Sequence, residues 1–102
     1  MSTKIPEIQE EIESSTELQE PSMHRVLLHN DNYTTMEFVI QVLEAVFNKQ
    51  PAEAFQIMLN VHKKGIGVCG FYTYEVAETK VAMVHHLARE HSFPLKCSME
   101  EV

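Results

Sequence analysis

Long apolar runs are scarce in this sequence, and so are basic residues and the motifs of common enzymes. The unbroken apolar stretches, of which residues 38–40 are typical, are only a few residues long, too short to cross a bilayer. Residues 1–6 contain no hydrophobic segment of a secretory signal, and the first residues are too acidic for a transit peptide. We therefore expect a soluble protein of the cytoplasm.

A surplus of basic residues is also absent. Eight basic and fifteen acidic residues give a net charge of −7, and residues 1–22 hold one lysine and six of the glutamates. Nucleic-acid binding requires clustered Lys and Arg, so no RNA or DNA partner is expected. The composition of residues 1–22 predicts a flexible acidic N-terminal extension. The rest of the 102 residues suffices for one folded domain, over residues 23–102.

The motifs of an enzyme are missing as well. There is no G-x-S-x-G, no phosphate loop and no H-E-x-x-H, so we expect neither catalytic residues nor a cofactor. Cys69 and Cys97 are 28 positions apart and form no C-x-x-C pair, which favours buried free thiols in a reducing compartment.

The six histidines leave a His/Cys metal-binding module as an alternative. Yet His85 and His86 are adjacent on a predicted helix, about 100° apart, so they do not converge easily on one ion. We interpret five of the histidines as solvated surface residues: His24, His29, His85, His86 and His91. No metal site is expected.

Hydrophobic periodicity predicts the order β-α-α-β-α-β. The expected strands cover residues 23–29, 65–72 and 95–99, and the expected helices cover residues 35–48, 51–64 and 74–91. Thr34 and Glu37 fit a capping box at the start of the first helix, and Thr73 fits the N-cap of the third. The fold class is α+β, a small domain in which three helices cover one face of a three-stranded antiparallel sheet.

The apolar positions of the helices predict which faces are buried. The second helix should place four residues on one broad face: Phe55, Met58, Leu59 and His62. The third should bury a stripe formed by Val76, Ala77, Val81, Val84, Leu87 and Ala88.

His62 differs from the other histidines because its helical neighbours are apolar. If the first two helices form an antiparallel pair, the loop Asn30-Asp31-Asn32 lies near the end of the second helix. Asn30 and His62 would then flank a shallow hydrophobic hole, whose walls are Thr34, Met36, Val39, Met58 and Val61. An Asn carbonyl and a neutral imidazole accept hydrogen bonds from an amine, while the hole takes a hydrocarbon side chain. The spacing permits this site without establishing it, and a core-edge histidine bonded to a backbone carbonyl remains the alternative.

At these same residues the chain resembles the ClpS family of N-degron adaptors, over about residues 22–102. The resemblance rests on several ordered motifs at matching intervals, which is more specific than any single signature. The matching stretches are residues 21–23, 28–39 (L-H-N-D-N-Y-T-T-M-E-F-V), 58–62 (M-L-N-V-H), 70–81 (G-F-Y-T-Y-E-V-A-E-T-K-V) and 94–95.

The resemblance implies an adaptor that binds the N-terminal residue of N-degron proteins, here Leu, Phe, Tyr or Trp. It implies delivery of these proteins to the ClpA or ClpC unfoldase of the Clp protease. It assigns the bonds to the substrate's α-amino group to Asn30 and His62, and a contact with the first peptide unit to Asp31. It assigns the pocket wall to six residues: Thr34, Met36, Val39, Met58, Val61 and Leu95.

Three further assignments follow from the same resemblance. Met36 stands at the family's gatekeeper position, which clashes with β-branched residues. Glu75 and Lys80 match positions that contact the N-terminal domain of the unfoldase, although a plain solvated pair is the alternative. The acidic extension matches a segment that helps to transfer cargo, with a solubilising tail as its alternative. We expect a monomer that binds no membrane.

Two positions depart from the family pattern. Asn32 replaces the second Asp of the usual N-D-D loop, which removes a carboxylate that would attract the substrate's ammonium group. Thr35 stands where the family commonly has Pro. A generic protein-interaction domain, with the topology of the stalk ribosomal protein's C-terminal domain, remains an alternative function.

Overall fold

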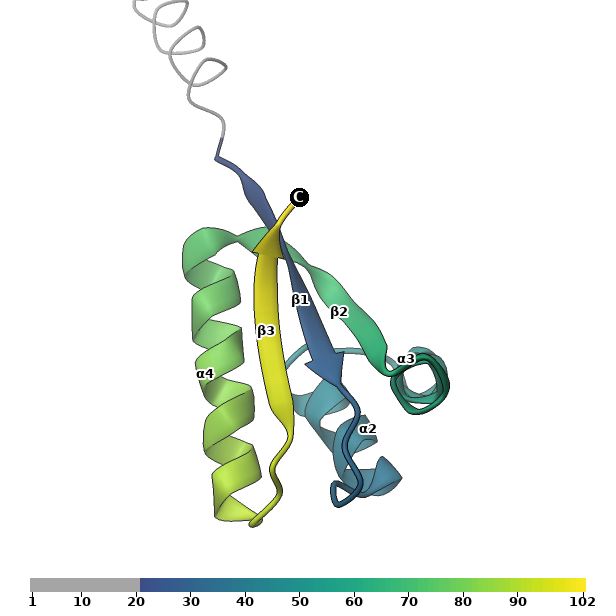
Figure 1. Ribbon diagram of the computed structural model, residues 1–102. Coiled ribbons are helices and arrows are strands. Elements are labelled where there is room, and N and C mark those ends of the chain that lie inside the picture. The colour runs from purple at the N-terminus through teal and green to yellow at the C-terminus, as the bar shows by residue number, and fades with distance from the viewer. Residues whose placement is uncertain (1–20) are drawn as a thin grey trace, which may run out of the picture.

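The computed structural model describes residues 21–102 (Figure 1), so nearly all of the predicted extension over residues 1–22 lies outside the described residues. The elements are β1 (Met23–His29), α2 (Met36–Ala45), α3 (Pro51–Lys64), β2 (Ile66–Thr73), α4 (Tyr74–Glu90) and β3 (Lys96–Glu101). This order confirms the predicted β-α-α-β-α-β fold. Within residues 21–102, no helix is both long and apolar enough to cross a membrane.

The sheet has the strand order β2-β1-β3, and both pairings are antiparallel. The central strand β1 is paired along its whole length with β2, from Met23 opposite Thr73 to His29 opposite Ile66. A register shift between Val26 and Leu27 marks an irregularity in this pairing. Because β1 is the central strand and runs antiparallel to β2, the loop that follows β1 lies at the end of the sheet where β2 begins.

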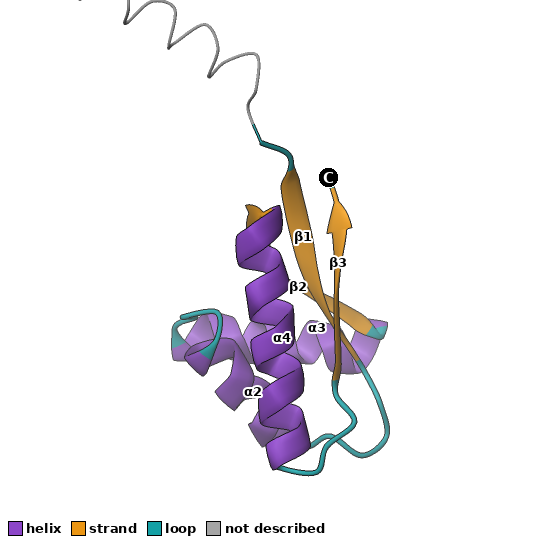
Figure 2. Ribbon diagram, turned by 90° about the vertical axis from the view of Figure 1, so that its left-hand side faces the viewer, coloured by secondary structure: helices purple, strands orange, loops and turns teal. Residues whose placement is uncertain are grey.

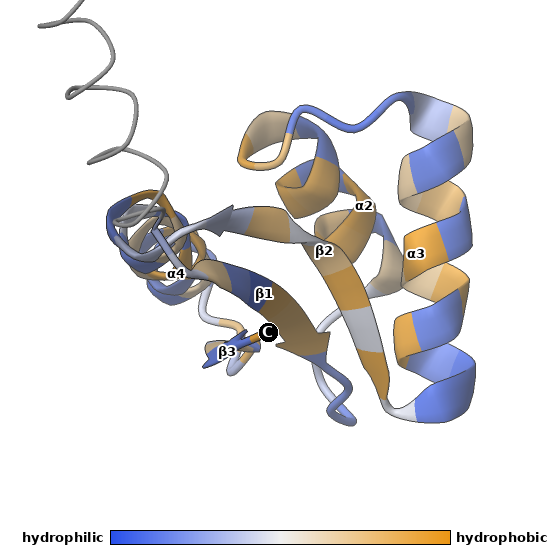
Figure 3. Cartoon of the chain, turned by 90° about the horizontal axis from the view of Figure 1, so that it is seen from above, coloured by the Kyte–Doolittle hydropathy of each residue, from blue (hydrophilic) through white to orange (hydrophobic). Residues whose placement is uncertain are grey.

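The helices cover one face of the sheet, as expected. In Figure 2, α4 runs along the strands, while α2 and α3 lie beyond it toward one end of the sheet. Figure 3 shows α3 standing beside β2, close to α2. Between these layers lies one hydrophobic core, to which all three helices and all three strands contribute. Its most completely buried large side chains are Leu28, Leu43, Val26, Val42 and Val84.

Several element boundaries differ from the prediction. The first helix ends at Ala45 rather than at residue 48, because Asn48 adopts a positive φ of 55°, which ends a right-handed helix. Gly65 is the left-handed C-cap of α3, with a φ of 86°, and not the first residue of β2. Strand β3 reaches Glu101, because it pairs with β1 as far as His24. Thr73 is the N-cap of α4, as predicted, but makes no capping hydrogen bond with its side chain.

The predicted faces are largely correct, with three exceptions. Phe55 on α3 is 50% exposed and Val76 on α4 is 44% exposed. His62, in the last turn of α3, is also exposed. Apolar spacing alone does not show where along a helix the neighbouring layer ends.

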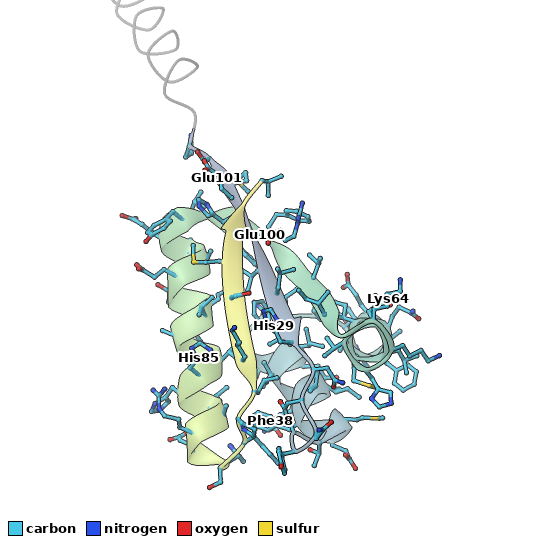
Figure 4. All side chains as sticks on the ribbon, in the orientation of Figure 1. His29, Phe38, Lys64, His85, Glu100 and Glu101 are labelled. Atoms are coloured by element: carbon cyan, nitrogen blue, oxygen red, sulfur yellow. The ribbon has the colours of Figure 1, made fainter. Side chains whose placement is uncertain are left out.

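The interpretation of all five histidines as solvated was wrong for His24, His29 and His85. His24 is half-buried, with its Nδ1 shielded from solvent and its ring packed edge-on against Tyr74. Nε2 of His29 lies 2.6 Å from the hydroxyl of Ser98, and Nε2 of His85 accepts the Cys97 amide at 3.1 Å. Figure 4 shows His85 reaching from α4 to β3. Partial burial, and then the charge of Lys96, lower the pKa of His29. His86 and His91 are exposed, as expected.

Both cysteines are free and buried, as predicted. They occupy the two outer strands, with β1 between them. Burial raises the pKa of Cys97 to about 12 and that of Cys69 further, so both thiols stay protonated and pack as small apolar groups.

Candidate functional site

The loop after β1 is organised by the carboxylate of Asp31. Its Oδ1 accepts the backbone amides of Tyr33 and Thr34 at 2.8 and 2.7 Å, and its Oδ2 accepts the Thr34 hydroxyl at 2.7 Å. An Asp that bonds the amides of the next residues folds the chain into a tight turn. Partial burial alone would raise the pKa of Asp31, but these hydrogen bonds outweigh it and lower the pKa. The carboxylate is therefore charged at neutral pH, and the loop has a defined shape.

The same loop is fixed to the end of α3. The Asn30 amide donates a hydrogen bond to the carbonyl of Gly65 at 3.0 Å, directly beyond the paired residues His29 and Ile66. Gly65 follows α3, whose last turn contains His62. The ladder between β1 and β2 thus brings Asn30 to the end of the helix that carries His62, as the sequence predicted.

Thr35, not Thr34, is the N-cap of α2. Its hydroxyl accepts the amide of Phe38 at 3.1 Å. The predicted capping box was wrong because Asp31 takes the Thr34 hydroxyl. Glu37 is consequently an exposed residue in the first turn of α2, and makes no side-chain hydrogen bond within residues 21–102.

A pocket of about 500 Å³ lies between this loop, the start of α2 and the last turns of α3. It contains all the predicted substrate-binding residues except Leu95. From the loop and α2 come Asn30, Asp31, Asn32, Thr34, Met36 and Val39, and from α3 come Met58, Val61 and His62. Three lining residues were not predicted: Tyr33, Thr35 and Glu37.

The pocket has an apolar floor and a polar rim. Val39, Met58 and Val61 are buried, with at most 6% of each exposed, whereas Asn30 and His62 are exposed. Met36 is 43% exposed and belongs to both parts. No lining residue is Lys or Arg. Such a site can enclose a hydrocarbon side chain and accept hydrogen bonds from a cationic amine beside it.

Leu95 does not line this pocket. It is 3% exposed and belongs to the hydrophobic core, just before β3. The family resemblance alone assigned Leu95 to the pocket wall. A resemblance identifies a position in the sequence, but it does not show which surface the side chain at that position reaches.

The two residues assigned to the unfoldase lie on α4, away from the pocket. Glu75 is exposed in the first turn of α4. Lys80 is partly buried, and its Nζ donates to the Val46 carbonyl at 2.8 Å. Its ammonium also lies over the rings of Phe47 and Tyr72, 5.8 and 5.2 Å from their centroids. Lys80 is therefore not part of a plain solvated pair with Glu75.

Within residues 21–102, no group of three His, Cys, Asp or Glu residues is placed to hold a metal ion. The described part of the chain thus offers no ligand cluster for the metal-binding alternative.

Comparison with known proteins identifies the family of this chain. Residues 19–98 match the family model described as ATP-dependent Clp protease adaptor protein ClpS. The chain belongs to the ClpS family. It is 58% identical over 103 residues to the adapter protein ClpS of Desulforapulum autotrophicum, covering 99% of each chain. It is 66% identical over 86 residues to that of Oleidesulfovibrio alaskensis, covering 84% of this chain and 83% of the other.

A solved ClpS structure has the same fold. Agrobacterium tumefaciens ClpS2, whose structure was determined with bound L-phenylalaninamide, superimposes with a TM-score of 0.78 at 35% identity. The match covers 80% of this chain and 99% of the other. That relative therefore binds an amino-acid amide with a free amino group and an aromatic side chain.

Sequence reasoning missed Tyr33 and Glu37 as pocket residues for different reasons. Glu37 was assigned to a cap that does not form. Tyr33 lies inside a matching motif, but no role was attached to it. Tyr33 is recognised as a pocket residue only in the structure, where 76% of this aromatic residue is exposed beside a hydrophobic pocket.

Proposed function

We propose that this ClpS-family chain binds proteins that begin with Leu, Phe, Tyr or Trp and acts as an adaptor without catalytic activity. The observation that carries the proposal is the shared pocket. Asn30 and His62 line the same cavity as the apolar residues of its floor. An N-terminal residue offers both features that such a cavity accepts, a cationic amine and an adjacent side chain.

The α-ammonium would donate to the carbonyl of Asn30 and to the neutral imidazole of His62. The first side chain would enter between Met36, Val39, Met58 and Val61, where burial of a Leu or Phe contributes about 1.5–3 kcal/mol. Acetylation of the amino group removes both its charge and most of its donors. Blocked N-termini are therefore excluded.

Asp31 supports this binding mode in two ways. Its hydrogen bonds to Tyr33 and Thr34 give the loop its shape. Oδ2 accepts only the Thr34 hydroxyl, so it retains a lone pair for the amide of the first peptide unit. Asn32 has no charge, so it contributes to affinity only through hydrogen bonds.

We also propose that the chain delivers its cargo to the N-terminal domain of a ClpA or ClpC unfoldase. The membership of a Clp protease adaptor family supports this step. Glu75 is exposed on α4 and is available for such a contact. Lys80 is the weaker candidate, since its ammonium already bonds to Val46.

Fluorescence anisotropy with two labelled peptides tests the proposal. Both begin with Phe and share one sequence, but one is acetylated at its N-terminus. We expect the free peptide to bind at least about tenfold more tightly, because a charge-assisted amine contact is worth about 1.5–3 kcal/mol. Equal binding of the two peptides would indicate the generic interaction domain. Stoichiometric zinc in the purified protein would support the metal module instead.

A further inference from the structure

The face of the sheet that points away from the helices has an apolar surface. An antiparallel sheet with one solvated face usually places polar residues on that face. On β2, Gly67 faces α3, since a Cβ there would meet Val61, so its neighbours Ile66 and Val68 point the other way. They are 39% and 40% exposed. Strand β2 therefore has apolar residues on both of its faces.

The register of the strands extends this apolar surface. Leu27 of β1 is paired with Val68 and is 6% exposed. Phe71 is 52% exposed, and the guanidinium of Arg25 lies over its ring, 5.8 Å from the centroid. In Figure 4 this face points toward the viewer, and no helix of residues 21–102 lies in front of the strands. Leu27, Ile66, Val68 and Phe71 form the apolar part of this open face, and a contiguous patch of this kind indicates a binding surface.

Basic residues lie at the end of the open face where β2 begins. Lys96 is paired with His29, whose other partner is Ile66. Partial burial and then the charge of Lys96 lower the pKa of His29, so the ammonium is close to this strand. Lys64 ends α3 two residues before Ile66. Both lysines are exposed, and within residues 21–102 neither forms an ion pair, so this end of the open face favours an acidic ligand.

The chain itself leads into the opposite end of the open face. Residues 1–20 precede β1 at the end of the sheet where Met23 pairs with Thr73 and its carbonyl accepts the Val102 amide at 3.0 Å. Twenty residues span about 30 Å at the rise of a helix, and the seven residues of β1 span about 23 Å. The segment is therefore long enough to run back along β1 as far as Lys96.

The sequence of this segment matches the chemistry of the open face. Ile5, Ile8 and Ile12 recur at intervals of three and four, the spacing of one helical face. Six residues of the segment are Glu and one is Lys. The segment thus offers apolar and acidic groups to a surface that offers apolar and basic ones.

We propose that residues 5–20 bind across the open face of their own chain, with the isoleucines against its apolar part and the glutamates toward Lys64 and Lys96. This contact removes apolar surface from water and brings opposite charges together. The composition of the segment favours flexibility in isolation, so the bound form depends on the sheet. The inference is independent of the proposed function, because the open face shares no residue with the pocket lining.

The outer surface of α4 is the competing site for the same segment. It contains a second cavity, of about 440 Å³, lined in part by Met83 and Leu87. Three exposed glutamates lie on the same helix, Glu75, Glu78 and Glu90. Because like charges repel, an acidic segment is better matched to the open face.

Paramagnetic broadening in the full chain tests the proposal. A nitroxide attached to Ser14→Cys marks the segment, while Cys69 and Cys97 stay unlabelled because both are buried and their raised pKa values keep them protonated. We expect the amide signals of Leu27 and Val68 to lose most of their intensity, and those along the outer surface of α4 to keep most of theirs. The loss should shrink at 1 M salt, where the Debye length is about 3 Å.

Four substitutions in the labelled chain, all at exposed sites, assign the contact. Val68→Ser removes apolar surface from the open face, and Lys96→Glu reverses a charge there, so each should restore intensity to β1 and β2. Val76→Ser and Arg89→Glu are the matched controls on α4. Both controls should keep the broadening of the unsubstituted labelled chain.

The remaining outcomes each contradict the proposal. Broadening centred on α4 would place the segment on the competing site, and no localised broadening would show that it does not bind the core. Broadening of β1 and β2 that survives in both Val68→Ser and Lys96→Glu would also exclude the open face. A mixture of labelled chain and unlabelled ¹⁵N chain tests a second copy, and broadening in that mixture would make the contact intermolecular.

Discussion

Lys80 on α4 donates a hydrogen bond of 2.8 Å to the backbone carbonyl of Val46, the C-cap of α2. The last carbonyls of a helix lack partners within the helix and carry partial negative charge, so a lysine there is favourable. The pocket lies at the other end of the same helix. Lys80 thus ties the helix that forms the pocket to the helix that holds Glu75.

Lys80→Met should lower the stability of the fold. The variant keeps the aliphatic length but loses the bond to Val46 and the contacts with Phe47 and Tyr72. We expect a loss of about 1–2 kcal/mol in the free energy of unfolding, measured by urea denaturation. Glu75→Gln, at an exposed site, should stay within about 0.5 kcal/mol and weaken only unfoldase binding. Loss of unfoldase binding by Lys80→Met without loss of stability would contradict the structural role.

Met36→Ala should widen the range of first residues that the pocket accepts. Met36 lines the pocket and is 43% exposed, and we propose that its side chain clashes with a first residue that is branched at Cβ. On this proposal the wild type rejects peptides beginning with Ile or Val, and we expect the variant to bind them and still to bind Leu. Anisotropy with these three peptides measures the change. Met83→Ala, an equally exposed residue of α4, is the control, and unchanged discrimination by Met36→Ala would place the gate elsewhere.

The sequence predicted the element order because the apolar periodicity and the turn residues agree along the chain. It also predicted nearly all of the pocket, since the loop after β1 and the end of α3 are neighbours in any antiparallel arrangement of these elements. It predicted the wrong one of two adjacent threonines as the N-cap of α2, Thr34 instead of Thr35. That choice depends on Asp31, whose hydrogen bonds appear only in the folded loop.

The same limit explains the errors at His24, His29 and His85. Each depends on contacts between elements distant in the sequence, such as the bond between His85 and the Cys97 amide. Periodicity assigns a side chain to one face of an element, but not to the neighbour it meets there. Tyr33 was missed for a related reason, because an exposed rim residue is recognised only once the cavity beside it is known.

Gly67→Ala should disturb the packing of β2 against α3, the helix that supplies part of the pocket floor. A Cβ at this position would lie 2.6 Å from Cγ2 of Val61 and 3.2 Å from the carbonyl oxygen of Ile57. Val61 is a floor residue with a short, stiff side chain, so α3 must shift away from β2. We expect a loss of about 1–3 kcal/mol in the free energy of unfolding and weaker binding of a Leu peptide.

Gly70→Ala provides the comparison for this substitution. A Cβ there meets only the ring of Tyr72 among its nearest atoms, which lies outside the pocket. That variant should retain peptide affinity. Equal affinity of Gly67→Ala and wild type, measured by anisotropy, would show that the pocket does not depend on this close packing of β2 and α3.

His29 should make the stability of the fold depend on pH. Partial burial and the charge of Lys96 lower its pKa in the folded state, while an unfolded histidine titrates near about 6.5. Below that value the unfolded chain binds protons more readily than the folded one. The contribution of His29 is therefore present above about pH 6.5 and is lost as the pH falls through the lowered folded pKa.

Urea denaturation of wild type and His29→Gln at several values between pH 5 and 8 measures this contribution. Glutamine stays uncharged throughout and can still bond to the Ser98 hydroxyl. The other histidines titrate in both proteins, so the difference between the two curves isolates His29. We expect the wild type to lose more stability than His29→Gln on acidification, and parallel curves would show that the site between β1 and β3 accepts a protonated imidazole without cost.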